Sequence, residues 1–263
     1  MDYKKLMDMT GKVCIVTGGT GYLGSENVKI LKDFGATVVI ADIRMAEERW
    51  ANAAQPAGDL FVECDVSKSE SIRACFQKVF DKYGRIDVLV NCASYGAGYG
   101  KDSQLEFMDD DTFMIGVDGS LGVVFRGMRE VVPFMKKNGG GSIINYGSMY
   151  GEVSPDLRIY GDNPQKQPPN YGAGKAGVRQ VTRYAAGALA EYGIRVNCVT
   201  PGPFPNPKNQ GDEAFNQQLA NKTMLGRFGQ SYEIAGAVLL LASDASSFMT
   251  GSNITVDGGW TAW

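Results

Sequence analysis

Short apolar runs alternate with longer amphipathic segments along this chain of 263 residues. The runs are rich in β-branched side chains, whereas the longer segments repeat apolar residues with helical spacing. The expected strands are Val13–Thr17, Thr37–Ala41, Leu60–Glu63, Val88–Asn91, Ser142–Tyr146, Arg195–Val199 and Asn253–Val256. The expected helices are Glu26–Asp33, Ser69–Tyr83, Thr112–Lys137, Gly172–Tyr192 and Tyr232–Ser243. Strands that alternate with helices predict βαβ crossovers, so we expect one doubly wound α/β domain with a mostly parallel sheet over residues 1–263.

Histidine is absent from the whole sequence. Its absence excludes a Ser-His-Asp triad, a Cys-His dyad and a His-ligated metal, so an acid or base must come from Asp, Glu, Lys, Tyr or Cys. The net charge is −3 and Lys and Arg form no block, which argues against nucleic acid or an anionic membrane as a partner. The five cysteines form no CxxC motif, and no secretory or membrane-spanning apolar run is present, so we expect a reducing, cytoplasmic compartment.

A glycine-rich turn follows the first expected strand and leads into the first expected helix. Residues 17–24 read TGGTGYLG. Glycines in such a turn let the backbone approach a pyrophosphate, and the amino end of the helix supplies N–H groups and a positive dipole end. The turn therefore predicts a nicotinamide dinucleotide site, the alternative being a turn that binds no ligand. The candidate contacts are Gly18, Thr20, Gly21, Tyr22, Leu23 and Gly24.

Asp42 ends the second expected strand, 18 residues after Gly24. A carboxylate there can accept hydrogen bonds from the adenosine ribose and would repel a 2′-phosphate, which favours NAD over NADP. Arg44 could offset that repulsion, and Asp42 could instead cap a helix. Polar and small residues that close the neighbouring strands are further candidates for the adenosine end, although several of them also favour turns. They are Ile43, Asp65, Val66, Asn91, Ala93 and Ser94.

Tyr171 and Lys175 open an expected helix and lie on one face of it, since they are four residues apart. A nearby ammonium favours the phenolate and lowers the pKa of a tyrosine from about 10, which suits acid/base chemistry in a chain without histidine. Ser148 directly follows the fifth expected strand. Its hydroxyl could hold the substrate oxygen on which Tyr171 acts, or it could merely cap a turn.

Taken together and in order, these motifs resemble those of the classical short-chain dehydrogenases/reductases over nearly the whole chain, with likeness to gluconate-5-dehydrogenase-like, sugar-type members. Pro201-Gly202, Thr250-Gly251 and the closing Val256-Asp257-Gly258-Gly259 complete the match. The resemblance implies a seven-stranded parallel Rossmann sheet, NAD(P) binding and usually a homotetramer, a homodimer being the alternative. It also implies a Ser148-Tyr171-Lys175 centre in which Lys175 binds the nicotinamide ribose. It adds Tyr171, Lys175, Pro201, Gly202 and Phe204 to the cofactor contacts. The expected halves are 1–150 for the cofactor and 151–263 for catalysis and substrate.

Four positions depart from the family pattern. Tyr22 stands where classical members usually carry Gly, and Cys92 and Ser94 replace Asn and Gly after the fourth strand. Ser120 occupies the position of the helix Asn that supports a water chain to the Lys, so it is a candidate for that relay. Ser148 and Tyr171 are 23 residues apart, which is longer than usual. Tyr160 offers the usual spacing, but it lacks the Lys four residues later.

Two long polar loops, residues 152–169 and 201–211, are expected to form the substrate site, and their polar residues predict the class of substrate. The first is the insertion that lengthens the Ser-Tyr spacing. The substrate candidates are Tyr150, Arg158, Lys166 and Asn206, and Lys208 and Asn209 lie in the second loop. Donors and acceptors of this kind favour a sugar, sugar acid or polyol, unless the loops simply face solvent. Trp260 and Trp263 could shape the pocket or pack between subunits.

The predicted function is NAD-dependent interconversion of a secondary alcohol and a ketone, without a metal and with Tyr171 as acid/base. The TGxxGxxG turn, residues 17–24, keeps a nucleotide-sugar epimerase or dehydratase as an alternative. The altered Ser120 position keeps a catalytically idle NAD-binding protein as another.

Overall fold

The computed structural model describes residues 2–43, 59–207 and 213–263. Seven strands form one sheet in the order β3-β2-β1-β4-β5-β6-β7, and every neighbouring pair is parallel. They are β1 Val13–Thr17, β2 Thr37–Asp42, β3 Leu60–Glu63, β4 Val88–Asn91, β5 Gly141–Tyr146, β6 Ile194–Pro201 and β7 Asn253–Val256. The expected strands and the doubly wound α/β class are confirmed.

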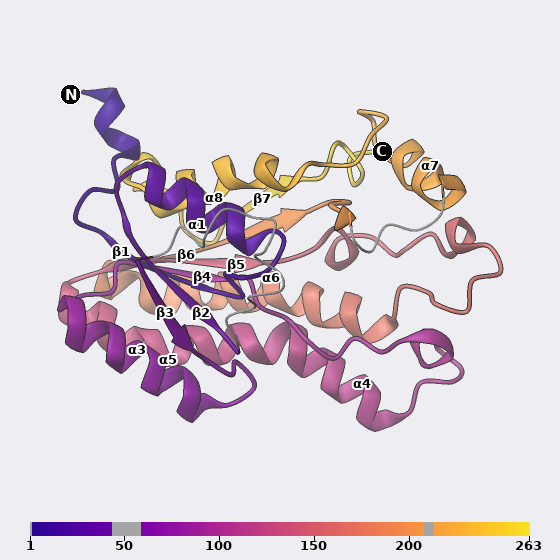
Figure 1. Cartoon of the computed structure of the whole chain (residues 1–263), viewed down its shortest axis with the longest axis horizontal. Coiled ribbons are helices and arrows are strands. Elements are labelled where there is room, and N and C mark those ends of the chain that lie inside the picture. Colours follow the sequence, from indigo (N-terminus) through magenta and orange to yellow (C-terminus); the bar gives the residue numbers. More distant parts are fainter. Residues whose placement is uncertain (1, 44–58, 208–212) are drawn as a thin grey trace.

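Helices cover both faces of this sheet (Figure 1). One layer holds α3 Ser69–Tyr83, α4 Asp110–Val117, α5 Val123–Asn138 and α6 Pro169–Leu189. The other layer holds α1 Gly24–Asp33 and α8 Ala235–Ala242. The remaining helix, α7 Glu213–Asn221, lies beside the C-terminal half of the chain. Short 3-10 turns are η1 Tyr3–Met7, η2 Gly100–Ser103, η4 Met149–Gly151, η5 Leu157–Tyr160, η6 Ala190–Tyr192, η8 Ser231–Ile234 and η9 Asp244–Ser246. Successive β1 residues enter opposite cores, Ile15 with α3, α5 and α6, and Val16 with α1 and α8, because side chains alternate across a strand.

The long helix expected over 112–137 is interrupted. A π-helical turn, η3 Asp118–Gly122, separates α4 from α5. Gly119 lies in this turn, where a Cβ would sit 2.0 Å from the carbonyl oxygen of Tyr95. The turn therefore presses its backbone against the loop that follows β4. Single π turns of this kind often occur at functional sites.

Two other boundaries differ from expectation. The helix α6 begins at Pro169 rather than at residue 172, because proline is well suited to the first helical position, where its missing N–H would have no partner. The helix α7 was not expected, since the sequence around it reads as a polar continuation of the loop after β6. The remaining helix boundaries lie within a few residues of the expected ones.

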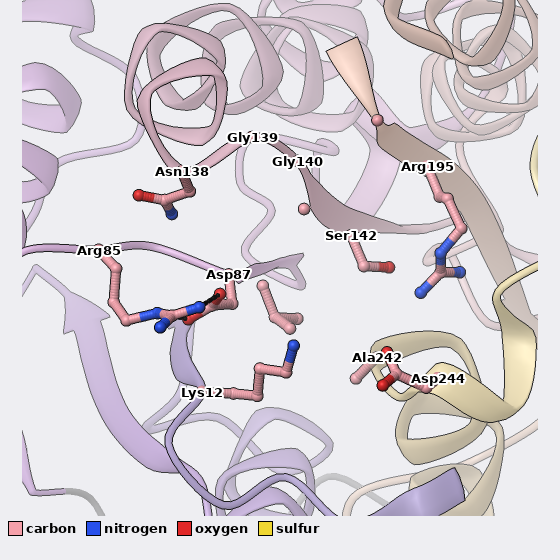
Figure 2. Close-up of a pocket in the computed structure, with 13 residues that line it drawn as sticks. Lys12, Arg85, Asp87, Asn138, Gly139, Gly140, Ser142, Arg195, Ala242 and Asp244 are labelled. Atoms are coloured by element: carbon pink, nitrogen blue, oxygen red, sulfur yellow. Dashed lines mark hydrogen bonds and ion pairs between the residues drawn. The ribbon is translucent and has the colours of Figure 1, made fainter. Parts of the chain in front are cut away.

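The order of the strands reverses between β1 and β4, so the carboxyl edge of the sheet opens a crevice there. At the opposite, amino edge of the sheet, charged and polar side chains make hydrogen bonds around a pocket of about 260 Å³ (Figure 2). Arg85 donates twice to Asp87, at 2.8 and 2.6 Å, and Asp87 also accepts the Val13 N–H. Arg195 donates to carbonyls at the end of α8, including Leu241 O at 3.0 Å. This edge therefore joins strands to one another and to α8, and the predicted cofactor and catalytic residues lie at the other.

Candidate active site

The glycine-rich turn is folded tightly against the loop after β4. Gly18 has a φ of +66°, and a Cβ there would lie 2.9 Å from Ala93 Cα. A Cβ on Gly24 would lie 2.1 Å from Gly18 O, so neither position accepts a larger residue without movement. The turn delivers the backbone of Tyr22 and Leu23 to the amino end of α1, where N–H groups lack helical partners. The residues present therefore fit a dinucleotide pyrophosphate.

A cavity of about 540 Å³ adjoins this turn. Eight of the predicted cofactor residues line it: Gly18, Gly21, Asp42, Ile43, Asp65, Val66, Ala93 and Ser94. The sequence reasoning did not select Ala41, Cys64, Ser67, Cys92 and Tyr95, which also line it. Burial raises the pKa of the Cys92 thiol to about 12, so this side chain contributes a neutral wall.

Asp42 connects the cavity wall to the glycine-rich turn. One carboxylate oxygen accepts the Thr20 N–H at 3.1 Å and also the Thr20 hydroxyl, and the other accepts the Ile43 N–H at 2.9 Å. Its carboxylate is thus held at the surface of the cavity where an adenosine ribose would lie. Arg44, the residue considered as an offsetting charge, lies outside the described residues.

Asn91 and Asp65 have clear local partners. Asn91 is buried beneath the cavity and donates to Asn145 Oδ1 at 2.9 Å, which links β4 to β5. Asp65 accepts from the Ser67 N–H at 3.0 Å and pairs with Lys68 at 3.1 Å. Hydrogen bonds from Ser67 are the main cause of the lowered pKa of Asp65, which keeps it charged at the cavity.

Past β6, the predicted cofactor residues Pro201, Gly202 and Phe204 lie at the same edge of the sheet. Pro201 ends β6, and the Gly202 N–H donates to Val256 O at 2.9 Å. A Cβ on Gly202 would lie 2.4 Å from Asp257 Cα, so this glycine permits the close approach of β6 and the chain after β7. Phe204 packs on the core beneath α8.

Ser148, Tyr171 and Lys175 are brought together by the packing of η4 on α6. Ser148 follows β5 and caps η4 by accepting the Tyr150 N–H at 3.2 Å. A Cβ on Gly151 would lie 2.7 Å from Lys175 C, so η4 rests directly on the helix turn that carries the Tyr-Lys pair. Lys175 is 4% exposed and donates from Nζ to Tyr146 O at 2.8 Å. The same Nζ lies 5.6 Å from the centre of the Tyr171 ring.

Aromatic side chains surround Tyr171. Tyr150 meets Trp260 edge to face with ring centroids 6.2 Å apart, and Tyr160 packs on Phe215 of α7 at 5.3 Å. These residues and Tyr171 belong to one apolar cluster, so the wall of the site is more aromatic than the polar loops predicted. Burial raises the pKa of Tyr160, so its hydroxyl stays protonated and is less available as a base.

The polar substrate candidates are spread over the insertion. The Arg158 side chain is 87% exposed and pairs with Asp156 at 2.8 Å. Lys166 donates from Nζ to Gly161 O at 2.6 Å and lines a cavity of about 730 Å³, together with Tyr150, between the insertion and η2. Asn206 lies in the loop after β6. Lys208 and Asn209 fall outside the described residues, as do residues 210–212.

The insertion is tied to the loop after β4. The Lys166 N–H donates to Ser103 Oγ at 2.8 Å, and Gln104 Nε2 donates to Pro164 O at 2.9 Å. The two segments that flank the predicted substrate region therefore support one another.

Ser120 lies in the π-helical turn, next to α6. A Cβ on Gly174 would lie 2.6 Å from Ser120 Cβ. The Ser120 hydroxyl is buried and has no hydrogen-bond partner among the described protein groups. Ser120 thus lies beside the helix that carries Tyr171 and Lys175, with its hydroxyl free to accept or donate.

Neither a metal site nor a membrane span emerges from residues 2–43, 59–207 and 213–263. Within these ranges His, Cys, Asp and Glu form no cluster of three or more suited to a metal ion. No helix in the same ranges has the length and apolarity needed to cross a bilayer.

Comparison with known proteins gives concordant results. The family model described as Enoyl-(Acyl carrier protein) reductase matches residues 23–261. The chain is 37% identical over 259 residues to 3-oxoacyl-[acyl-carrier-protein] reductase FabG of Thermotoga maritima, covering 96% of this chain and 99% of that protein. It is 36% identical over 260 residues to trans-4-hydroxycyclohexanecarboxylate dehydrogenase of Sinomonas cyclohexanicum, covering 95% and 93%. A gluconate 5-dehydrogenase from Burkholderia cenocepacia, solved with NADP and tartrate, superposes with a TM-score of 0.85 at 29% identity, covering 98% of each chain.

Proposed function

Since the chain belongs to the short-chain dehydrogenase/reductase family, whose members interconvert alcohols and ketones, we propose that it is an NAD-dependent dehydrogenase of a ring-shaped polar alcohol with Tyr171 as acid/base. The observation that carries this proposal is that Lys175 Nζ lies 5.6 Å from the centre of the Tyr171 ring, on a helix turn against which η4, capped by Ser148, packs directly.

The chemistry follows from these three side chains. When bound, the nicotinamide accepts or donates the hydride. The buried Lys175 ammonium is held by Tyr146 O, so a positive charge lies 5.6 Å from the centre of the Tyr171 ring. The phenolate takes the hydroxyl proton of the alcohol, and the Ser148 hydroxyl hydrogen-bonds the same oxygen. In the reverse direction, Tyr171 returns that proton to the carbonyl oxygen.

The substrate class combines two features of the site. Aromatic side chains such as Tyr150, Phe215 and Trp260 can bury the C–H faces of a saturated ring. The loops around them supply donors and acceptors for further hydroxyl or carboxyl groups. A cyclic sugar acid, sugar or polyol satisfies both features, and so does a hydroxylated cyclohexane carboxylate. Among the similar proteins, trans-4-hydroxycyclohexanecarboxylate dehydrogenase is named for a ring alcohol and gluconate 5-dehydrogenase for an open-chain sugar acid.

The preference for NAD rests on charge. The described lining of the 540 Å³ cavity contains Asp42 and Asp65 and no lysine or arginine. A 2′-phosphate beside Asp42 would meet a like charge, whereas a ribose hydroxyl would meet an acceptor. The Burkholderia neighbour was solved with NADP, so this preference is a property of the present residues rather than of the fold.

The assembly we infer is a cytoplasmic homotetramer. Large apolar side chains on α4 and α5 face outward, with Met114 60%, Ile115 52% and Phe125 48% exposed. Such a patch on two neighbouring helices favours burial against a second copy. Light scattering coupled to size exclusion should give four times the 28.4 kDa chain mass. A monomer at micromolar concentration would contradict this part of the proposal.

Reduced-nicotinamide absorbance tests the function. The panel comprises cyclic polyols, sugar acids, 4-hydroxycyclohexanecarboxylate and, in the reductive direction, a 3-oxoacyl thioester. We expect NAD reduction with ring alcohols and its loss in Tyr171→Phe. Activity confined to the thioester would reject the ring-alcohol class and favour an acyl reductase. Isomerised product without net reduction would favour the epimerase alternative, and NAD binding without turnover would favour the idle protein.

A further inference from the structure

Asn170 directly precedes Tyr171 in the first turn of α6 and is fully buried, with 0% of its surface exposed. Its side-chain Nδ2 donates to Thr112 O of α4 at 2.9 Å. The start of the helix that carries Tyr171 is therefore joined to a neighbouring helix by a side-chain amide. The proposed chemistry does not use this amide.

Glycines make room for this contact. A Cβ on Gly116 of α4 would lie 2.1 Å from Asn170 Nδ2, so the amide occupies the space that a side chain at 116 would take. Four residues further along both segments the arrangement is reversed, because a Cβ on Gly174 would lie 2.6 Å from Ser120 Cβ. The two helical segments thus meet along one seam, in which each polar side chain faces a glycine.

Stability alone accounts poorly for an amide in this seam. Asn170 Oδ1 is buried and has no hydrogen-bond partner among the described protein groups, and the same holds for Ser120 Oγ one step along the seam. The free-energy cost of burying an unpaired oxygen offsets the stabilisation from the single Nδ2 hydrogen bond. Gly116 and Gly174 also weaken their helices relative to alanine. The directional hydrogen bond to Thr112 O is what the amide contributes beyond packing.

We propose that Asn170 is a positioning residue that fixes the first turn of α6, and with it the direction in which Tyr171 points toward Ser148. Lys175, one turn later, has its own anchor on Tyr146 O of β5. Without Asn170, the start of α6 would be held by the insertion that enters it and by the packing of η4, where a Cβ on Gly172 would lie 3.0 Å from Tyr150 O. The inference rests on the proposed role of Tyr171 as acid/base.

The test compares turnover with cofactor affinity in Asn170→Ala. We expect kcat to fall roughly 10- to 100-fold, since a displacement of about 1 Å of a catalytic group can cost about 10²-fold. The dissociation constant for NAD, measured by fluorescence titration, should stay within about twofold, because the 540 Å³ cavity lies on other elements and Lys175 keeps its own anchor on Tyr146 O. Asn170→Ser, whose hydroxyl is too short to replace the amide, should show the same loss and serves if the alanine variant folds poorly. Turnover within twofold of wild type in a folded variant would overturn the inference.

Asn138→Ala is a matched control. Asn138 also donates a side-chain amide to a backbone carbonyl, Ile86 O at 2.7 Å, but at the amino edge of the sheet (Figure 2). It should lower the melting temperature by a similar amount and leave kcat unchanged. If Asn138→Ala loses as much turnover as Asn170→Ala, the effect is one of general stability and the inference fails.

A double variant separates positioning from packing. In Gly116→Ala/Asn170→Ala the new methyl group fills space vacated by the amide, so the melting temperature should recover relative to Asn170→Ala while kcat does not. Recovery of both would reduce Asn170 to a space-filling residue and overturn the inference. Tyr171→Phe separates the proposed function from the positioning role of Asn170. If Tyr171→Phe remains active, the proposed function itself is wrong. If Tyr171→Phe is inactive and Asn170→Ala is fully active, only the positioning role is rejected.

Discussion

Replacing Asp42 by serine should change which dinucleotide the protein prefers. Asp42 is one of two carboxylates, with Asp65, at the wall of the 540 Å³ cavity, and it is partly exposed. Two like unit charges about 4 Å apart repel by about 4 kcal/mol at an effective dielectric constant of about 20. Solvent and salt at this exposed wall reduce the repulsion to about 1–2 kcal/mol, so NADP should bind roughly 5- to 30-fold better in Asp42→Ser.

The same substitution weakens NAD. A hydrogen bond to a charged acceptor contributes about 1.5–3 kcal/mol, and Asp42→Ser removes the carboxylate that would accept from the ribose hydroxyls. The ratio of kcat/KM for NAD to that for NADP should therefore fall roughly a hundredfold or more. Initial rates with both cofactors at fixed ionic strength measure this ratio directly.

Thr20→Val is the control for this prediction. Asp42 also accepts from the Thr20 N–H and hydroxyl, so part of its effect could come from loosening the glycine-rich turn. Thr20→Val removes the hydroxyl contact and keeps the carboxylate. Both cofactors should weaken together in this variant, with their ratio unchanged. An unchanged ratio in Asp42→Ser, or an equal shift in Thr20→Val, would refute the charge argument.

Three further outcomes can be checked with single substitutions. Tyr160→Phe should keep most of the wild-type turnover while Tyr171→Phe loses it, because the Lys175 ammonium lies 5.6 Å from the Tyr171 ring, whereas burial raises the pKa of Tyr160; the reverse pattern in a rate assay would exchange their roles. Gly24→Ala should abolish NAD binding in a fluorescence titration and lower the melting temperature, since its Cβ would lie 2.1 Å from a carbonyl oxygen of the same turn; retention of wild-type affinity would contradict the close approach. Hydrogen bonds from Arg227 and the Gln230 N–H hold the pKa of Glu233 at about 2, below the usual 4.5, so its stabilising contribution is present above pH 4.5 and is lost as the pH falls toward 2. Acid titration of the free energy of unfolding should therefore fall less steeply over this interval in Glu233→Gln than in wild type.

The sheet could be predicted because buried parallel strands are continuously apolar. Residues 13–17 and 88–91 consist of such runs, and both strands have the expected bounds. The glycine-rich turn could also be predicted, because its glycines permit close contacts with residues a few positions away and with Ala93 at the end of a predicted strand. Local pattern and global fold agree at this end of the molecule.

The seam between α4 and α6 could not be predicted from local pattern. The helical pattern predicted one helix through residues 118–122, whereas the structure has a π turn there, in which the Gly119 backbone lies against the Tyr95 carbonyl. The importance of Asn170 depends on Thr112 and Gly116, which only the fold brings beside it. Three glycines inside expected helices, at 116, 119 and 174, were the available signal of close approach.

The aromatic character of the site was hidden for a different reason. In the insertion the polar residues outnumber the apolar ones, but Arg158 faces solvent while Ile159 and Tyr160 turn inward. Phe215 belongs to α7, a helix that the sequence did not reveal. The amino-acid composition of a loop counts its solvent-facing and inward-facing residues together, whereas a ligand contacts only the inward-facing ones.

The ties between the insertion and the loop after β4 matter for anyone who wishes to move this specificity into another scaffold. Ser103 and Gln104 hold the backbone of Lys166 and Pro164, so residues 152–169 take their shape partly from a segment that lies 60 to 63 residues upstream of these contacts. A chimera that receives the insertion alone would lack these partners and should display a misfolded loop. Transplanting residues 99–108 with it would move the two as one exchangeable module.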